Sequence, residues 1–339
     1  MSPAHGNISR RRFVKQAAAF SSAAFLSSCT RPGDNDPLTS TMTGPSGNPD
    51  GQSPLTGGTL ADEMPRRKLG NTDLYVSCLS FGGGSQFKAN GDGAWEPLLE
   101  RAIELGVNYF DTHRGYGTEN RYGEILPAYR DRIYLATKTD SRDNTGIRND
   151  LDESLKQLKT DYLDVYLLHD CNGPDPSAWE VLQNLKSEGL VKYIGFSNMS
   201  DSNGAKAIIE QHKPDIALMA MSACGYGGFK DNALPAAVSG NSGVLAMKTL
   251  RYCTGQATAR ELLAYVLDLE GVSTAMVGHA GGAEQLEENV GIVKEVASAV
   301  GIKVDRAALE RRLAPLANPY HMKWARADYR DDGDSYMWC

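Results

Sequence analysis

Three signatures that would point directly to a function are missing from this chain of 339 residues. Its net charge of -7 gives no basic excess, which argues against a nucleic-acid partner. Its six cysteines show no CxxC spacing, which disfavours zinc sites, iron–sulfur clusters and a disulfide framework. Its N-terminal apolar run is too short to span a bilayer as a stable helix. The hydrophobic content of 41% and charged content of 23% are nevertheless those of a globular protein with a sizeable core.

The first 29 residues have the layout of an export signal. Ser9-Arg10-Arg11-Arg12-Phe13-Val14-Lys15 precedes the apolar run Ala17–Leu26. This order resembles the twin-arginine signal, with which bacteria export folded proteins. Leu26-Ser27-Ser28-Cys29 resembles a lipobox, in which the cysteine is lipidated; ordinary signal-peptidase cleavage, with Cys29 incidental, is the alternative. We therefore expect export by the twin-arginine machinery to the periplasm or cell envelope, and a membrane anchor on Cys29.

Composition divides the remaining chain into three parts. Residues 30–63 are rich in Pro, Gly, Ser, Thr and Asp and lack apolar periodicity, so they cannot offset the entropy of ordering and are predicted to be a disordered linker. Residues 64–291 alternate strand-length apolar runs with amphipathic stretches. Residues 292–339 are predicted to add C-terminal helices and a polar, aromatic tail.

The alternation predicts eight strands and the helices between them. The predicted strands are Val76–Phe81, Val107–Asp111, Ile133–Thr137, Tyr162–Leu168, Tyr193–Ser197, Ile216–Met221, Val244–Lys248 and Thr274–Gly278. The predicted helices are Trp95–Leu105, Asn149–Leu158, Trp179–Glu188, Ala205–His212, Ala233–Val238, Ala259–Leu269 and Glu284–Val290, followed by Val293–Val300 and Arg306–Leu313. Near-continuous apolar strands that alternate with helices indicate a parallel sheet covered by helices.

Eight such units in about 220 residues favour a closed (β/α)8 TIM barrel with a C-terminal helical and tail extension. The alternative is a doubly wound open sheet, which usually carries a GxGxxG fingerprint at its first helix. Gly82-Gly83-Gly84 begins no such fingerprint. In a barrel the carboxyl ends of all strands meet on one face, and this face usually holds the active site.

Four ionisable side chains fall at adjacent strand ends. Asp111 ends one predicted strand, Tyr116 lies in the glycine-rich turn after it, Lys138 ends the next, and His169 follows the one after that. Each alone has an ordinary structural interpretation, such as a solvated strand end or a buried histidine. Together they contain no nucleophile–base pair and no good metal site, so we expect no bound metal.

The chemistry of these four residues fits carbonyl reduction. Hydride delivered to a carbonyl carbon leaves charge on oxygen, so a proton donor must stand beside that oxygen. A phenol with a pKa of about 10 is a poor donor near neutrality, but a neighbouring ammonium lowers the pKa. Lys138 can supply that ammonium and Asp111 can orient it. His169 can donate a hydrogen bond to the developing oxyanion.

These residues and the motifs around them resemble those of the aldo/keto reductases, from about Arg66 to about Gly291. The motifs that carry the resemblance are Arg67-Lys68-Leu69-Gly70, Gly106-Val107-Asn108-Tyr109-Phe110-Asp111-Thr112 with Tyr116-Gly117, Lys138, His169, Gly195-Phe196-Ser197-Asn198 and Glu287-Glu288-Asn289. The resemblance implies NAD(P)H-dependent interconversion of a carbonyl and an alcohol, with Tyr116 as acid/base. It implies that Lys138 and Asp111 tune Tyr116, and that His169 orients the carbonyl.

The resemblance also implies where the dinucleotide lies. Ser197 and Asn198 would hydrogen-bond its carboxamide, and Glu288 and Asn289 would contact its adenine end. Two departures concern this cofactor. The sixth strand offers Met221 where relatives often place an aromatic that stacks on the nicotinamide, and a thioether also packs well on a flat ring.

The second departure leaves the preference between NADP and NAD open. After the eighth strand, Gly278 is followed by His279 and later Gln285, where relatives commonly place Lys and Arg for the ribose 2′-phosphate. Without those cations a phosphate loses charge-assisted hydrogen bonds. Lys248 and Arg251 follow the seventh strand on the same face of the barrel. They are candidates to bind the 2′-phosphate in place of the missing cations.

Two interpretations of the whole protein remain. The first is an oxidoreductase acting on a small aldehyde, ketone or alcohol, with a polar aromatic tail that would suit a sugar-like substrate. The second is a weakly active or inactive relative that serves as a cofactor-binding or regulatory module. The intact set of four residues favours the first, and the altered cofactor contacts favour the second. The tail is either a lid over the substrate or a segment packed on the barrel surface.

Overall fold

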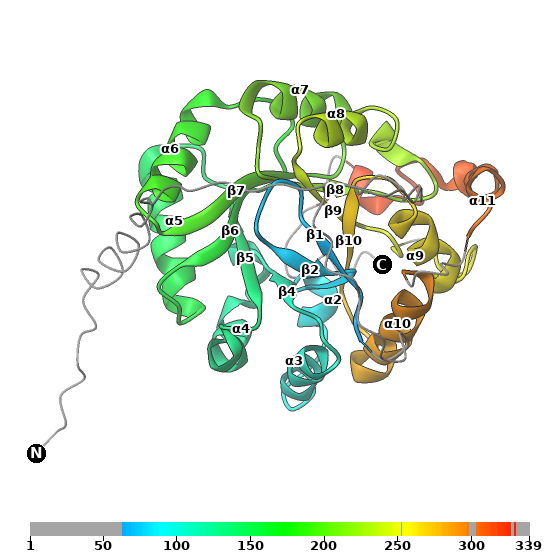
Figure 1. Ribbon diagram of the computed structural model, residues 1–339, viewed down its shortest axis with the longest axis horizontal. Coiled ribbons are helices and arrows are strands. Elements are labelled where there is room, and N and C mark those ends of the chain that lie inside the picture. Colours follow the sequence, from blue (N-terminus) through cyan, green and yellow to red (C-terminus); the bar gives the residue numbers. More distant parts are fainter. Residues whose placement is uncertain (1–62, 252, 298–302, 327–328, 330–339) are drawn as a thin grey trace, which may run out of the picture. The chain divides into compact units, whose positions relative to one another are not determined.

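The protein folds as a closed barrel of eight parallel strands inside a ring of helices (Figure 1). The computed structural model describes residues 63–251, 253–297, 303–326 and 329. The barrel strands are β3 (Leu79–Gly82), β4 (Tyr109–Asp111), β5 (Tyr134–Thr139), β6 (Leu163–Leu168), β7 (Val191–Asn198), β8 (Ile216–Ala220), β9 (Gly243–Met247) and β10 (Val272–Val277). Strand β10 pairs with β3 and closes the sheet. The predicted (β/α)8 barrel is confirmed, and each predicted strand overlaps an observed one. The expected export signal, Cys29 and the predicted linker up to residue 62 lie outside the described residues.

A short antiparallel hairpin precedes the barrel. Strands β1 (Arg66–Lys68) and β2 (Tyr75–Ser77) pair with each other and belong to a separate two-stranded sheet. The prediction of one strand over Val76–Phe81 was therefore wrong. The chain pairs first with β1 and breaks at Cys78, whose amide donates to Pro65, before it enters the barrel as β3.

The barrel interior is a packed core. Leu69 and Leu74 between the hairpin strands, with Val76 of β2, pack against side chains from the barrel strands. The barrel residues in this cluster are Tyr109, Ala136, Val165, Leu167, Ile216, Leu218, Leu245 and Met276. Burial of these apolar groups is worth about 1.5–3 kcal/mol for each large side chain. The hairpin thus fills the barrel from the end opposite to the site, whose residues lie at the carboxyl ends of the strands.

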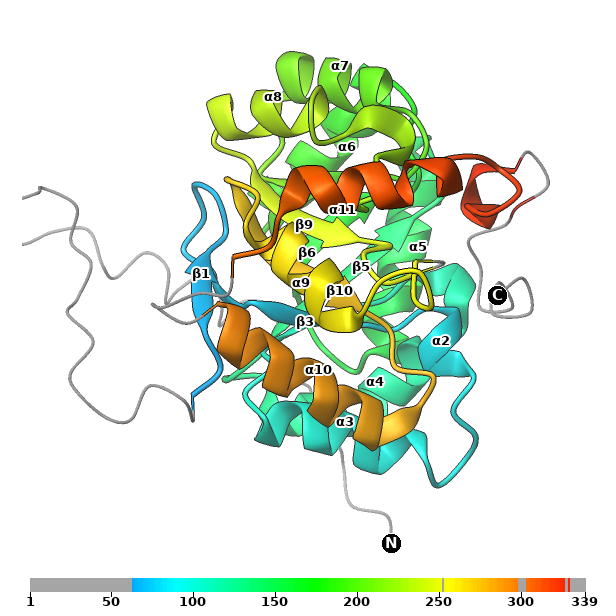
Figure 2. The same cartoon turned by 90° about the vertical axis from the view of Figure 1, so that its right-hand side faces the viewer.

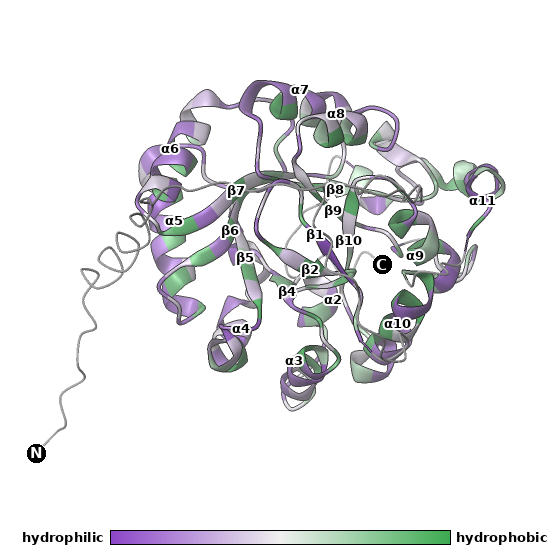
Figure 3. Ribbon diagram, in the orientation of Figure 1, coloured by the Kyte–Doolittle hydropathy of each residue, from purple (hydrophilic) through white to green (hydrophobic). Residues whose placement is uncertain are grey.

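The helices mostly match their predicted positions. They are α2 (Ser85–Lys88), α3 (Trp95–Glu104), α4 (Glu119–Ile125), α5 (Asn144–Gln157), α6 (Pro176–Ser187), α7 (Ser202–His212), α8 (Ala233–Ser239), α9 (Ala259–Leu267), α10 (Gly282–Val296) and α11 (Arg306–Leu313). Several carry polar residues on one side and apolar residues on the other (Figure 3). This pattern is typical of helices that cover a sheet. No helix in the described ranges is both long and apolar enough to cross a membrane.

Helices α5 and α10 differ most from their predicted bounds. Helix α5 starts five residues before the predicted Asn149, because Asp143 caps it by accepting a hydrogen bond from the amide of Gly146 at 3.0 Å. Helix α10 runs through Gly291, where two separate helices were predicted. A glycine inside a helix costs only about 1 kcal/mol, and the packing of Val290 and Val293 against the core offsets it.

The segment after α10 packs against the barrel. Helix α11, predicted with the same bounds, lies near α9 (Figure 2). Glu310 of α11 accepts a hydrogen bond from Tyr265 of α9 at 2.7 Å. Farther along, Met322 and Trp324 are buried, and so is Tyr329. The described part of the tail is therefore a packed surface segment.

Candidate active site

The two charged members of the predicted set form a buried ion pair. Asp111 ends β4, and Lys138 lies near the end of the neighbouring strand β5. The Lys138 ammonium lies 2.5 Å from Asp111 Oδ2 and donates to the carbonyl of Thr112 at 2.8 Å. Both side chains are almost completely buried. Removal of one partner would leave the other charge buried and unpaired, so the two residues depend on each other.

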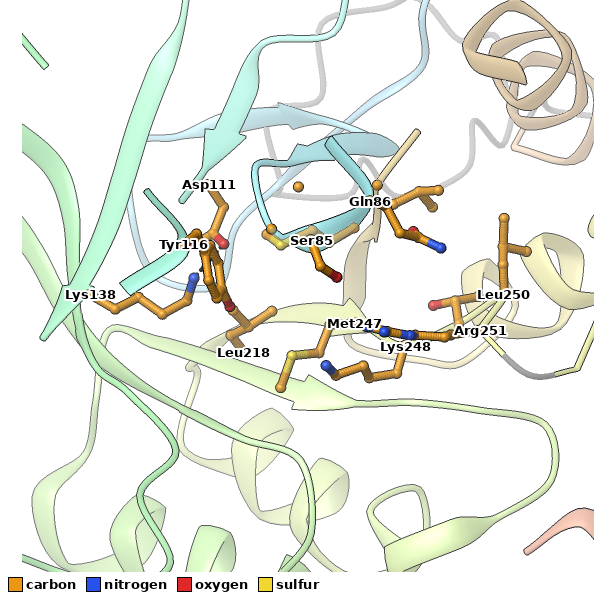
Figure 4. A pocket seen from close by; sticks show the side chains of 16 residues that line it. Ser85, Gln86, Asp111, Tyr116, Lys138, Leu218, Met247, Lys248, Leu250 and Arg251 are labelled. Atoms are coloured by element: carbon orange, nitrogen blue, oxygen red, sulfur yellow. Dashed lines mark hydrogen bonds and ion pairs between the residues drawn. The ribbon is translucent and has the colours of Figure 1, made fainter. Parts of the chain in front are cut away.

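Tyr116 lies beside this pair. It ends a 3-10 turn, Arg114–Tyr116, and Gly117 follows with φ of +67°, which returns the chain toward α4. The Lys138 ammonium lies 5.2 Å from the centre of the Tyr116 ring. Tyr116, Lys138 and Asp111 line the same cleft (Figure 4). The structure thus brings three of the four predicted residues together in the way the sequence predicted.

His169, the fourth member, follows β6 directly. Its ring lies edge-on to Tyr116, with centroids 6.0 Å apart and an interplanar angle of 89°. Its Nδ1 lies 2.7 Å from Asp140 Oδ1. Its backbone carbonyl accepts a hydrogen bond from Arg142 at 2.5 Å. The position of the imidazole is therefore set by contacts on both its ring and its main chain.

The sequence analysis missed two residues at this site, His113 and Asp140. His113 stacks obliquely on His169, with ring centroids 4.0 Å apart, and lies edge-on to Tyr116 at 5.0 Å. Burial lowers the pKa of His113 to about 4, so the ring is neutral at neutral pH. The two imidazoles hold the pKa of Asp140 far below its usual range, against the opposing effect of its partial burial. Both residues follow strand ends, so the rule that found the other four could have found them too.

The cleft continues from Tyr116 toward the ends of β9 and β10. Its floor is apolar, with Leu218 of β8, Met247 of β9 and Met276 of β10. Lys248 and Arg251 lie at the end away from Tyr116 (Figure 4). The other lining residues in the described part of the chain are Gly82, Gly84, Ser85, Gln86, Thr249, Leu250, Val277 and Gly278. Of the predicted cofactor contacts, Lys248 and Gly278 lie in this cleft.

Lys248 and Arg251 share a contact with the tail. The phenol oxygen of Tyr329 accepts from Lys248 Nζ at 3.3 Å and from Arg251 at 3.5 Å. Lys248 has φ of +61°, in the left-handed region that is unfavourable for a residue with a side chain. Two cations with a polar partner at one end of an apolar cleft suit the phosphates of an extended ligand.

Ser197 and Asn198 are buried beneath the loops that follow β6 and β7. The Ser197 hydroxyl accepts the amide of Asp170 at 3.0 Å. Asn198 donates to the carbonyl of Cys171 at 2.5 Å, and its side-chain oxygen accepts the amide of Asp201 at 2.9 Å. The structure therefore shows them joining loops rather than lining the cleft described above.

Met221 and His279 are also turned away from the cleft. Met221 is buried, and Met247 of the next strand lies in the cleft instead. His279 stacks on Phe81, with centroids 5.1 Å apart, and neither ring nitrogen has a hydrogen-bond partner among the described residues. Burial lowers the pKa of His279 to about 3. Such a neutral, inward-facing ring does not replace a phosphate-binding lysine in this conformation.

The remaining predicted contacts lie at the start of α10. Gln285 accepts the amide of Gly281 at 3.0 Å, so one of the glycine amides at this helix start is already occupied. Glu288 is exposed. Asn289 is buried, and its side-chain nitrogen has no hydrogen-bond partner within the described part of the chain. An unsatisfied buried amide is unusual and is consistent with a polar ligand at this point.

Comparison with known proteins identifies the family. The model of the aldo/keto reductase family matches residues 79–250, about half of the chain. The chain belongs to the aldo/keto reductase family. The matched range contains Asp111, Tyr116, Lys138 and His169, so this site lies inside the shared region.

Individual aldo/keto reductase relatives are similar to different extents. The uncharacterized oxidoreductase YqkF of Bacillus subtilis (strain 168) is 34% identical over 158 residues, which are 40% of this chain and 49% of that protein. L-galactose dehydrogenase of Arabidopsis thaliana is 28% identical over 307 residues, 74% of this chain and 95% of that protein. The chain spans about half the length of several curated relatives that it matches.

A solved structure of the family shares the fold. Aldo-keto reductase AKR11C1 from Bacillus halodurans, in its holo form, superposes with a TM-score of 0.60 at 21% identity. The match covers 80% of this chain and 100% of that one. At this identity the likeness supports the barrel architecture and nothing finer.

Proposed function

We propose that this aldo/keto reductase family member is an NAD(P)H-dependent oxidoreductase that interconverts a carbonyl and an alcohol. The observation that carries the proposal is the contact chain from Asp111 through Lys138 to the ring of Tyr116, with His169 edge-on to that ring. The substrate is a small aldehyde, ketone or alcohol, and the polar, aromatic tail would suit a sugar-like compound. Methylglyoxal reductase DkgA and L-galactose dehydrogenase among the relatives are named for substrates of this kind.

The cleft has features that fit a nicotinamide dinucleotide. Leu218 and Met247 form an apolar floor for a flat ring, and Lys248 and Arg251 offer charge to phosphates. Thr249 also lines the cleft, and its buried hydroxyl has no hydrogen-bond partner among the residues described. Bound there, NADPH or NADH would supply the hydride that reduces the carbonyl carbon. Since Lys248 and Arg251 line the cleft and the positions of His279 and Gln285 provide no cation, we propose no preference between the two cofactors.

The residues of the site handle the proton and the charge. Tyr116 donates its phenolic proton to the carbonyl oxygen as charge develops there, and takes it back in the reverse reaction. The Lys138 ammonium stabilises the phenolate that remains, and Asp111 holds the ammonium in place. His169 uses Nε2 for the substrate oxygen, because Nδ1 faces the Asp140 carboxylate. A hydrogen bond from Nε2 would stabilise the negative charge that develops on that oxygen.

A cofactor-binding module without catalysis is the second candidate. The observation in its favour is Tyr329, which contacts Lys248 and Arg251 in the cleft and so competes with a ligand's phosphates. The intact arrangement of Asp111, Lys138 and Tyr116 argues for the enzyme.

One screen separates the two candidates. The purified protein is mixed with NADPH or NADH and a panel of aldehydes, ketones and sugars, and the absorbance of the reduced cofactor is followed. The oxidised cofactors are tested with the matching alcohols. The enzyme proposal predicts turnover with at least one pair. Cofactor binding without turnover of any pair would favour the binding module.

We further propose that the protein is exported by the twin-arginine route and anchored to the membrane through lipid on Cys29. The support comes from the sequence alone: Arg10 and Arg11 precede an apolar run that ends at Leu26-Ser27-Ser28-Cys29. The twin-arginine route carries folded proteins, so the barrel can bind its cofactor before export.

A further inference from the structure

Three side chains that can ligate a metal meet beside Tyr116. His113 lies two residues after β4, Asp140 follows β5 directly, and His169 follows β6 directly. One ligand atom from each lies within 4.8 Å of the other two. We call these three residues the His–Asp–His cluster. Neighbouring parallel strands place their carboxyl ends side by side, which explains why residues so far apart in sequence converge here.

The carboxylate of Asp140 lies between the two imidazoles. His169 Nδ1 lies 2.7 Å from Asp140 Oδ1, and His113 Nε2 lies 3.0 Å from Asp140 Oδ2. Both separations are hydrogen-bond distances. Ligands that share one tetrahedral ion with bonds of about 2.0–2.2 Å lie roughly 3.3–3.6 Å apart, so ion binding requires the exposed Asp140 side chain to move outward by less than about 1 Å. Each oxygen of the Asp140 carboxylate therefore lies next to one ring nitrogen, Oδ1 next to His169 and Oδ2 next to His113.

Hydrogen bonds to the described residues do not satisfy the buried ring nitrogens of His113. Its ring is buried, with 2% of its surface exposed. Neither Nδ1 nor Nε2 has a hydrogen-bond partner within the described residues, although Nε2 is only 3.0 Å from Asp140. Nε2 therefore has only the ion-pair contact with Asp140, and Nδ1 has no polar contact within the described residues. A buried polar group of this kind calls for an explanation, and an ion is one of the standard ones.

The charge and accessibility of the cluster suit a cation. The Asp140 side chain is 67% exposed, so an ion can enter from solvent although both imidazoles are buried. Imidazole nitrogens and carboxylate oxygens are both ligands of zinc in proteins. The Lys138 ammonium is paired with Asp111 at 2.5 Å. Arg142 directs its guanidinium to the main-chain carbonyls of His169 and Asp140.

We propose that His113, Asp140 and His169 bind one divalent first-row transition-metal ion, with Zn2+ as the representative. The ligands would be His113 Nε2, His169 Nδ1 and a carboxylate oxygen of Asp140. Two imidazoles and one carboxylate favour zinc and its neighbours over magnesium, which prefers oxygen ligands. Three protein ligands leave a coordination position for water, as in sites that are not purely structural.

The test measures zinc binding by the full-length protein without cofactor or substrate. The protein is stripped with a chelator, dialysed, and titrated with ZnCl2 in a calorimeter. We expect one ion per chain with a dissociation constant in the micromolar range or tighter. MgCl2 under the same conditions should give no heat of binding at this site.

Matched variants assign the site. Asp140→Asn should weaken zinc binding by at least about tenfold, and its exposed position makes misfolding a poor explanation. His113→Ala should have the same effect, with circular dichroism as the check on its fold. Asp152→Asn, an exposed acid on α5, and His212→Ala, whose ring stacks on Trp179, should both bind zinc like the wild type.

Two results would overturn the site: no zinc binding by the wild type, or Asp140→Asn and His113→Ala binding as tightly as the wild type. Because the measurement uses neither cofactor nor substrate, it is independent of the proposed reductase activity. An inactive protein that binds zinc through Asp140 would refute the proposed activity and retain the metal site.

Discussion

The Lys138 ammonium lies close to two other residues of the candidate active site. It is 2.5 Å from Asp111 Oδ2 and 5.2 Å from the centre of the Tyr116 ring. The strand pairing of β4 and β5 brings the carboxylate and the ammonium together, and the turn after β4 returns the phenol to them. One buried cation therefore serves both the fold and the proposed chemistry.

Removing that cation should destabilise the protein. Lys138→Met leaves the Asp111 carboxylate buried without its closest partner, so the free energy of unfolding should fall by about 3–5 kcal/mol. The double variant Asp111→Leu with Lys138→Met should recover part of the loss, because no uncompensated charge remains. Urea denaturation measures both effects.

Lys303→Met is the control for the ion-pair prediction. Lys303 is 85% exposed and pairs with Asp268 at the surface, so its loss should cost less than about 1 kcal/mol. An equal loss of stability in Lys138→Met and Lys303→Met would mean that the buried pair has no special energetic role.

His279 should make stability depend on pH. Its pKa is about 3 in the folded protein because of burial, whereas a histidine in the unfolded chain titrates near 6.5. Between these values the unfolded state binds a proton that the folded state does not. The free energy of unfolding therefore falls as pH decreases below about 6.5, at up to about 1.4 kcal/mol per pH unit from this residue.

Replacing His279 tests that assignment. His279→Leu keeps an apolar contact with Phe81 and should flatten the decline in stability between pH 6 and pH 4.5 relative to the wild type. His321→Leu, at an exposed position in the tail, should leave the decline unchanged. Parallel slopes for the wild type and His279→Leu would remove His279 as a cause.

Lys248 and Tyr329 should have opposite effects on cofactor affinity. Lys248→Met removes a charge-assisted hydrogen bond to a phosphate, which is worth about 1.5–3 kcal/mol, or roughly tenfold to hundredfold in the dissociation constant. Tyr329→Phe removes a competing partner of Lys248 and Arg251, so it should tighten binding severalfold. Fluorescence titration with NADPH and NADH measures both.

Tyr320→Phe is the matched control for the tail. Tyr320 is 83% exposed, so its variant should bind the cofactor like the wild type. If Lys248→Met leaves the dissociation constants of both cofactors unchanged, the phosphates do not lie at this end of the cleft.

The export proposal predicts where variants of the signal accumulate. Replacing Arg10 and Arg11 with Lys should leave the precursor in the cytoplasm, because the twin-arginine pair is lost. Cys29→Ala should release an exported protein from membrane fractions. Cell fractionation and immunoblotting measure both outcomes. A wild-type protein recovered wholly in soluble fractions would refute the lipid anchor but leave export open.

The barrel and the core of the site were predictable because they depend on local pattern. Strand-length apolar runs mark the strands, and strand ends converge in any parallel barrel, so Asp111, Lys138 and His169 could be placed together before the structure was known. The same rule applied to every strand end would also have found His113 and Asp140.

Side-chain direction was the part that the sequence could not supply. Ser197 and Asn198 stand at the expected strand end, yet their side chains bond to neighbouring loops. Met221 and Met247 are both methionines near the ends of neighbouring strands, so the sequence does not distinguish them. The barrel geometry places Met247 in the cleft. The sequence does not show the break at Cys78, because only this one residue separates β2 from β3. The two strands nevertheless belong to different sheets.

The most direct test of the account is the turnover of Tyr116→Phe, measured with the best carbonyl substrate from the screen. Loss of the phenolic proton donor should lower kcat by roughly 100-fold to 10,000-fold, while the Kd of NADPH or NADH stays within a factor of about 3. Tyr320→Phe should keep wild-type kcat. A Tyr116→Phe enzyme with unchanged kcat would contradict the proposal that Tyr116 is the acid/base of this site.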